Sequence, residues 1–132
     1  KEGINYDKVL YSRWAWANEP YQCINYISAH DNYTLWDKLS ISNQDSSIEK
    51  RKNMNKLAAA IVLTSQGIPF FQSGEEFLRT KKNDDGSFNH DSYNAPDRVN
   101  NLEWSRAHEY KDIVNYYRGL IKLRKKYKAF RS

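Results

Sequence analysis

The chain has 132 residues, 39% of them hydrophobic and 14% aromatic, which allows one domain and argues against disorder, a class usually poor in aromatic residues. Its net charge of +5 comes largely from basic runs at residues 50–52 and 122–128, which lie near acidic residues on predicted helices and indicate solvated helix faces rather than a nucleic-acid surface. The single cysteine, Cys23, excludes an internal disulfide, and the sequence shows no zinc-type spacing, signal peptide or apolar membrane span.

The first predicted element is a buried strand. Residues 1–20 before it predict an irregular packed loop that contains Trp14 and Trp16. The strand covers residues 22–28, and its apolar residues do not alternate with polar ones, which is typical of a strand buried on both faces. Cys23 within it is expected to be a small buried hydrophobe.

Two helices are predicted next. A short one covers residues 34–39, and a polar linker at 40–47 leads to a longer one at 47–65. Ser46 and Glu49 have the spacing of a capping box at the start of the longer helix. The residues expected on its apolar side are Met54, Leu57, Ala58, Ile61 and Leu63.

The remainder of the chain predicts another strand and another helix. Residues 68–72 predict a second buried strand, which Gly67 separates from the preceding helix and in which Pro69 is tolerated near the start. Residues 77–104 predict a long polar loop, and loops of this length are usually functional or disordered. The last helix is predicted at 108–128. Its apolar stripe consists of Ile113, Tyr116, Tyr117, Leu120, Arg124 and Tyr127.

The order strand, helix, strand, helix defines two consecutive β/α units of an α/β fold. Two such strands cannot close a barrel and leave the edges of the sheet unpaired, so we expect further strands from outside these residues. His30, Asp31 and Asn32 follow the first strand directly. In barrels of β/α units, catalytic groups lie at the C-terminal ends of the strands. The alternative is an ordinary polar turn, because Asp and Asn are common turn residues.

Three blocks of sequence carry a family resemblance. They are INYISAHDNYTLWDKL at residues 24–39, GIPFFQSGEEFLRTK at 67–81 and DSYNAPDRVN at 91–100, the last followed by Trp104. In this order they resemble the type I pullulanases, which are debranching enzymes of the α-amylase superfamily (glycoside hydrolase family 13). Three blocks in the family order are a more specific signal than any one of them.

The resemblance implies that residues 1–132 are the C-terminal part of a catalytic (β/α)8 TIM barrel, namely strands 7 and 8 with their helices. Such an enzyme would cleave α-1,6-glucosidic bonds of pullulan, starch or glycogen with retention. By the same match, Asp31 would stabilise the transition state, His30 would hydrogen-bond the same sugar and Asn32 would be a neighbouring substrate contact. An ionised carboxylate suits that role, because glycoside cleavage passes through a positively charged, oxocarbenium-like state.

A retaining glycosidase also needs a nucleophile and a separate general acid. In the family both lie on earlier strands, and neither family segment is found in this sequence, so we expect the chain alone to be inactive. Its expected partners are an α-glucan and the missing N-terminal part of the same barrel. No cofactor is expected, and calcium, which the full-length protein could bind, is not supported here because Asp84 and Asp85 lack the spacing of a calcium loop.

The second and third blocks contain further candidates. Arg79 could clamp the loop by pairing with Glu76, or it could bind sugar. Asn94 and Asp97 match a family loop that borders the substrate, and their side chains suit contacts to hydroxyl groups, with a proline-containing turn as the alternative. Glu75 and Glu76 are adjacent at one strand end and point to opposite sides, which favours a structural role.

Two other classes of function remain as hypotheses. One is an isoamylase or glycogen-debranching relative within the same superfamily. The other is a non-catalytic carbohydrate-binding piece, which would use aromatic platforms and would not depend on the carboxylate of Asp31. Replacing Asp31 by Asn in the complete protein distinguishes an enzyme from a binding module, because a binding module has no turnover to lose.

Overall fold

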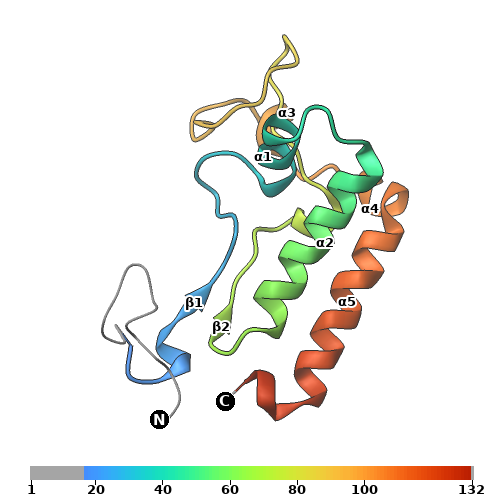
Figure 1. Cartoon of the computed structure of the whole chain (residues 1–132). Coiled ribbons are helices and arrows are strands. Elements are labelled where there is room, and N and C mark those ends of the chain that lie inside the picture. Colours follow the sequence, from blue (N-terminus) through green and yellow to red (C-terminus); the bar gives the residue numbers. More distant parts are fainter. Residues whose placement is uncertain (1–16, 132) are drawn as a thin grey trace.

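The computed structural model describes residues 17–131, which form a small mixed α/β piece (Figure 1). Its strands and main helices are β1 (Ile24–Asn25), α1 (Leu35–Ser42), α2 (Ile48–Thr64), β2 (Ile68–Pro69), α3 (Asp97–Asn100), α4 (Ser105–Glu109) and α5 (Lys111–Lys126). The strands pair in parallel, with Ile24 opposite Ile68 and Asn25 opposite Pro69. The predicted order of strand, helix, strand and helix is therefore confirmed, and the part after β2 contains the additional short helices α3 and α4.

Three short 3₁₀ helices complete the described elements: η2 (Pro20–Gln22), η3 (Glu75–Phe77) and η4 (Lys128–Phe130). The loop predicted for residues 1–20 lies almost entirely outside the described residues, and so do Trp14 and Trp16. None of the helices within residues 17–131 is both long and apolar enough to cross a membrane.

Hydroxyl side chains cap the first two helices. Thr34 caps α1, and its hydroxyl accepts the amide hydrogen of Asp37 at 3.1 Å. Ser47 caps α2 in the same way at 3.2 Å. The capping box predicted at Ser46 and Glu49 is wrong by one residue, because the helix begins one position later and its orphan amide hydrogens are reached by Ser47.

Gly67 sets the path of the chain from α2 into β2. Its φ is +98°, and a Cβ at this position would lie 2.8 Å from the carbonyl oxygen of Cys23 and 2.9 Å from that of Pro20. This close approach allows the amide of Ile68 to donate to the carbonyl of Cys23 at 2.8 Å. The parallel pairing of the two strands therefore depends on a residue without a side chain.

The core lies between α2 and α5, which run side by side (Figure 1). Its buried members are Ala59, Leu63, Leu78, Ile113 and Tyr117. The guanidinium of Arg124, on α5, donates to the carbonyl of Leu63 at 3.2 Å and to those of Ser65 and Gly67, each at 2.5 Å. These carbonyls lie at the end of α2, where the helix itself offers no donors, so Arg124 joins the two helices.

The prediction that both strands are buried is wrong for the described chain. Ile24 is 59% exposed and Ile68 49%, and Tyr26 and Phe70 are exposed next to them. The strands are also shorter than predicted. Parallel strands are buried when further strands and helices cover both faces, and within residues 17–131 nothing does so on the outer side of this pair. Cys23, expected to be buried, is half-buried.

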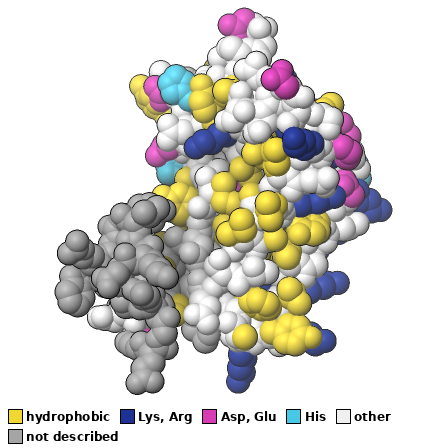
Figure 2. Space-filling view, in the orientation of Figure 1, with side chains coloured by type: hydrophobic (Ala, Val, Ile, Leu, Met, Phe, Trp, Pro, Cys, Tyr) yellow, Lys and Arg dark blue, Asp and Glu magenta, His cyan; other side chains and the backbone are white. Residues whose placement is uncertain are grey.

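The apolar side predicted for α2 is partly wrong. Leu57 is 61% exposed and Ile61 58%, whereas Asn55 is fully buried. The amide nitrogen of Asn55 donates to the hydroxyl of Tyr117 at 3.1 Å, so a polar pair with α5 sets the rotation of α2. Leu63 is buried as predicted. Hydrophobic side chains gather on the face of the molecule where α2 lies (Figure 2).

The segment predicted as a loop at 77–104 contains some regular structure. Lys82 and Phe88 form an antiparallel bridge, and α3 follows. The helix predicted at 108–128 is present as α4 and α5, separated at Tyr110. Ile113, Tyr117 and Arg124 are buried in it as predicted, while Tyr116 and Tyr127 are 38% and 46% exposed.

Candidate active site

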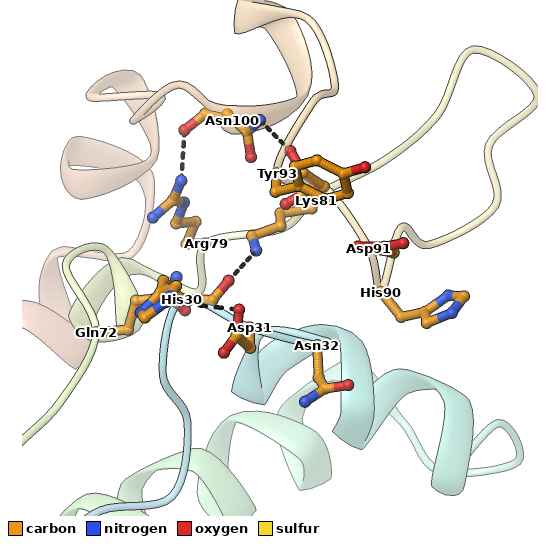
Figure 3. A pocket seen from close by; sticks show the side chains of 11 residues that line it. His30, Asp31, Asn32, Gln72, Arg79, Lys81, His90, Asp91, Tyr93 and Asn100 are labelled. Carbon is orange, nitrogen blue, oxygen red and sulfur yellow. Dashed lines mark hydrogen bonds and ion pairs between the residues drawn. The ribbon is translucent and has the colours of Figure 1, made fainter.

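An open cavity of about 620 Å³ lies between the loop after β1 and the segments after β2 (Figure 3). It is lined by His30, Asp31, Asn32, Gln72, Arg79, Lys81, His90, Asp91, Ser92, Tyr93 and Asn100. Four of the six site residues predicted from sequence are therefore brought together. The other two, Asn94 and Asp97, are exposed and lie outside the lining, and their role in binding stays a prediction.

The His30 and Asp31 side chains project from the loop after β1 into this open space. Their nearest atoms, Nε2 and Oδ1, are 3.5 Å apart, and the two side chains are 87% and 77% exposed. Asn32 follows with a φ of +61°, in the left-handed region that Asn tolerates better than most residues. This turn leaves the carboxylate of Asp31 open to a ligand, so it can stabilise a positive charge that develops in the cavity.

Arg79 holds two chain segments together. Its guanidinium donates to the carbonyl oxygen of Ser73 at 3.3 Å and to that of Asn100. Burial lowers the pKa of Arg79, and the carboxylate of Asp37 acts in the opposite direction. The clamp that the sequence suggested is thus present, but its acceptors are backbone carbonyls rather than Glu76. Arg79 also lines the cavity, and its contact with sugar stays a prediction.

Sequence reasoning missed Lys81, which lines the cavity, and Asp37, which anchors the backbone of Lys81. Asp37, on α1, is fully buried and accepts hydrogen bonds from the hydroxyl of Thr80 and from the amide of Lys81, the latter at 2.8 Å. Burial raises the pKa of the Asp37 carboxyl, and these hydrogen bonds oppose the rise. The ammonium of Lys81 donates to the carbonyl of His30 at 2.8 Å. Charged residues in a helical turn and a polar loop resemble ordinary surface residues, so no local pattern marked them.

Glu75 and Glu76 have separate partners. Glu75 is 5% exposed and accepts hydrogen bonds from the hydroxyl groups of Ser28 at 2.6 Å and Tyr117 at 2.9 Å. Burial raises the pKa of its carboxyl, which these two donors partly offset. Glu76 accepts from the amide of Gly74 at 2.9 Å. Neither carboxylate lines the cavity, which agrees with a structural role.

Residues 90–93, at the end of the loop that follows Lys82, form one wall of the cavity. Tyr93 is 84% exposed at its edge, and the ring of His90 lies 5.6 Å from that of Tyr33. Asp84 pairs with Arg98 through two hydrogen bonds of 2.8 and 2.6 Å. Within residues 17–131, no group of three or more His, Cys, Asp or Glu residues is placed to hold a metal ion.

Comparisons with known proteins identify the class to which these features belong. No family model matches the chain. A pullulanase of Bacillus subtilis is 44% identical over 113 residues, which cover 86% of this chain and 15% of that protein. An isoamylase of a Flavobacterium species is 26% identical over 138 residues, 87% of this chain and 17% of that protein.

A solved structure is similar as well. The pullulanase of Paenibacillus barengoltzii, in complex with maltohexaose and α-cyclodextrin, superposes with a TM-score of 0.83 at 50% identity, covering 98% of this chain and 19% of that one. The matched proteins are glycoside hydrolases. The chain belongs to the pullulanase family, and it spans less than a fifth of the length of these relatives.

Proposed function

We propose that this chain is the last two β/α units, strands 7 and 8 with their helices, of the (β/α)8 barrel of a pullulanase. The complete protein cleaves α-1,6-glucosidic bonds of pullulan, starch or glycogen with retention. The observation that carries the proposal is the exposed His30–Asp31 pair, which lines a cavity at the end of β1 in a chain 44% identical to a pullulanase. The isoamylase alternative is less favoured, because that match is only 26% identical.

The exposed apolar residues support an incomplete barrel. Ile24 and Ile68 on the strands, and Leu57 and Ile61 on α2, are each about half exposed or more. Exposing apolar side chains to water is unfavourable in free energy. Neighbouring strands and helices of a complete barrel would cover these side chains and remove that cost. The missing N-terminal part of the barrel is therefore the first partner of this chain.

Each predicted site residue has a role in the proposed reaction. Asp31, ionised, stabilises the oxocarbenium-like transition state, and His30 and Asn32 hydrogen-bond the same sugar. Hydroxyl contacts that tighten in that state lower the barrier further. Asn94, Asp97 and Arg79 contact the substrate beyond the reacting sugar. The nucleophile and the general acid come from earlier strands, so the isolated chain does not hydrolyse glucans.

The test is the Asp31→Asn variant of the complete protein. Loss of the negative charge should lower kcat on pullulan by about 10²–10³-fold or more, while maltotetraose still binds, because the amide keeps the shape of the side chain. Asp45→Asn, an exposed carboxylate in the linker before α2, is the matched control and should keep wild-type kcat. Wild-type turnover in Asp31→Asn would overturn the role given to Asp31.

A second measurement tests the barrel itself. The polypeptide that carries this sequence in its native host should have a mass several times the 15.6 kDa of these residues. A peptide from residues 67–81, detected by mass spectrometry in size-separated extract, identifies that polypeptide. A mass near 15.6 kDa would contradict the proposal that the chain is part of a catalytic barrel, and would favour a non-catalytic carbohydrate-binding protein.

A further inference from the structure

Lys81 is a buried cation in the wall of the candidate active site. It is 2% exposed, and its ammonium donates to the carbonyl oxygen of His30 at 2.8 Å (Figure 3). That carbonyl belongs to the peptide group that joins His30 to Asp31. The lysine side chain therefore holds the backbone unit from which the carboxylate of Asp31 projects.

The backbone of Lys81 is itself anchored to the same loop region. Its amide donates to Oδ2 of Asp37 at 2.8 Å, and the hydroxyl of Thr80 donates to the other oxygen of that carboxylate. Asp37 is fully buried in the first turn of α1, a few residues beyond the His30–Asp31 turn. Three hydrogen bonds thus run from residues 80–81 to His30 and Asp37, and together they hold the two segments side by side.

Keeping an ammonium in this position is costly. Burial and the nearby guanidinium of Arg79 lower the pKa of Lys81, and the carboxylates of Asp37 and Asp31 oppose this. An ammonium has three hydrogens to donate, and within the described residues its acceptor is the His30 carbonyl. Replacing such a group by an apolar one is often neutral for stability or even favourable, so stability alone gives little reason for a charge here.

The turn that carries Asp31 needs external support. Asn32 has a φ of +61°, and conformations of this kind persist where surrounding contacts determine them. The Asp31 side chain is 77% exposed, and its Oδ1 lies 3.5 Å from Nε2 of His30, whose side chain is 87% exposed. The side chain itself is therefore weakly held, and its direction depends on the backbone.

We propose that Lys81 is a positioning residue, whose ammonium fixes the His30–Asp31 peptide and so aims the Asp31 carboxylate at the reacting sugar. The inference rests on the proposed function, because it needs Asp31 to act in catalysis. A displacement of about 1 Å in a catalytic group can lower the rate about a hundredfold without weakening the binding of substrate. A direct sugar contact by Lys81 would instead raise KM.

The test compares two neighbouring lysines in the complete protein. Lys81→Met keeps the length and volume of the side chain and removes the donor. Lys82→Met is the matched control, because Lys82 is exposed, lies over the ring of Phe88 and makes no hydrogen bond to the His30 loop within residues 17–131. For each variant, kcat and KM on pullulan and the midpoint of thermal unfolding are measured. Lys81→Met should lose about tenfold to a hundredfold in kcat with KM within about twofold, and Lys82→Met should match the wild type.

The outcomes separate this inference from the proposed function. Wild-type kcat in Lys81→Met, or a loss that appears in KM, overturns the positioning role while the Asp31→Asn result still stands. Wild-type turnover in Asp31→Asn overturns the proposed function instead. If Lys81→Met does not fold, Lys81→Arg decides: its longer, planar guanidinium keeps the charge but shifts the peptide. A folded Lys81→Arg with reduced kcat and unchanged KM supports the inference, and one with wild-type kcat overturns it.

Discussion

The hydroxyl of Ser28 donates to the carboxylate of Glu75 at 2.6 Å, although 47 positions separate them in the sequence. Ser28 lies in the loop after β1, just before the His30–Asp31 turn, and Glu75 begins η3 after β2. The same carboxylate accepts from Tyr117 on α5. One buried acid thus joins the loop after β1 and the segment after β2 to α5.

The Glu75→Gln variant tests how this acid responds to pH. Burial raises the pKa of Glu75 above its usual value of 4.5, so the folded state binds its proton more tightly than the unfolded state does. Its contribution to stability is therefore complete at low pH and is lost as pH rises through the folded-state pKa. Relative to wild type, the thermal midpoint of Glu75→Gln in the complete protein should rise as pH increases above the usual pKa of 4.5 and should level off above the folded-state pKa. If the difference in thermal midpoint between Glu75→Gln and wild type does not change with pH, the pKa of Glu75 is not raised by burial.

Arg124 should be required for the α2–α5 contact. Arg124→Met leaves the carbonyls of Leu63, Ser65 and Gly67 without their donor, each in a part of the structure with limited access to water. The expected loss is about 2–4 kcal/mol in the free energy of unfolding, measured by chemical denaturation. Lys125→Met removes an exposed cation from the next position and should change stability by less than about 0.5 kcal/mol. If the two changes lower the free energy of unfolding equally, the hydrogen bonds from Arg124 to the end of α2 do not stabilise the protein.

Two glycines should respond oppositely to the same substitution. Gly67→Ala places a Cβ within 2.9 Å of two carbonyl oxygens at a φ of +98°, so it should destabilise by about 2–3 kcal/mol and separate β1 from β2. Gly119→Ala lies in α5 with open space around the added carbon and should stabilise by about 0.5–1 kcal/mol. Thermal unfolding of both variants measures the contrast. A tolerated Gly67→Ala would show that the close approach of the strands is not required.

The exposed face of α2 distinguishes the isolated chain from the complete protein. Replacing Leu57 and Ile61 together by Lys should raise the solubility of the isolated chain, because both side chains are more than half exposed there. In the complete protein the same double change should lower the thermal midpoint, because the barrel would bury these positions. Sedimentation assays and thermal unfolding provide the two measurements. An unchanged midpoint in the complete protein would show that nothing packs on this face.

The sequence predicted best those features that depend on residues close together along the chain. The periodicity of apolar residues and the turn residues between them predicted the order of the elements. The His30–Asp31 pair, predicted to follow the first strand, lies in the loop after β1 and lines the cavity. Sequence reasoning failed for the rotation of α2, because Asn55 is buried by a hydrogen bond to Tyr117, a residue far along the chain. It also could not show that Asn94 and Asp97 lie outside the cavity lining, since the path of a long loop has no periodicity.

The sequence alone therefore determined the β/α order, the family and the candidate carboxylate Asp31, because each depends on residues that are neighbours along the chain. Only the tertiary structure decided which distant groups support that carboxylate. The contacts of Lys81 with His30, of Asp37 with Lys81 and of Glu75 with Ser28 each join segments more than 40 residues apart. Such pairs form where parallel strands bring their carboxyl ends to one edge, and burial there makes every polar group depend on finding a partner.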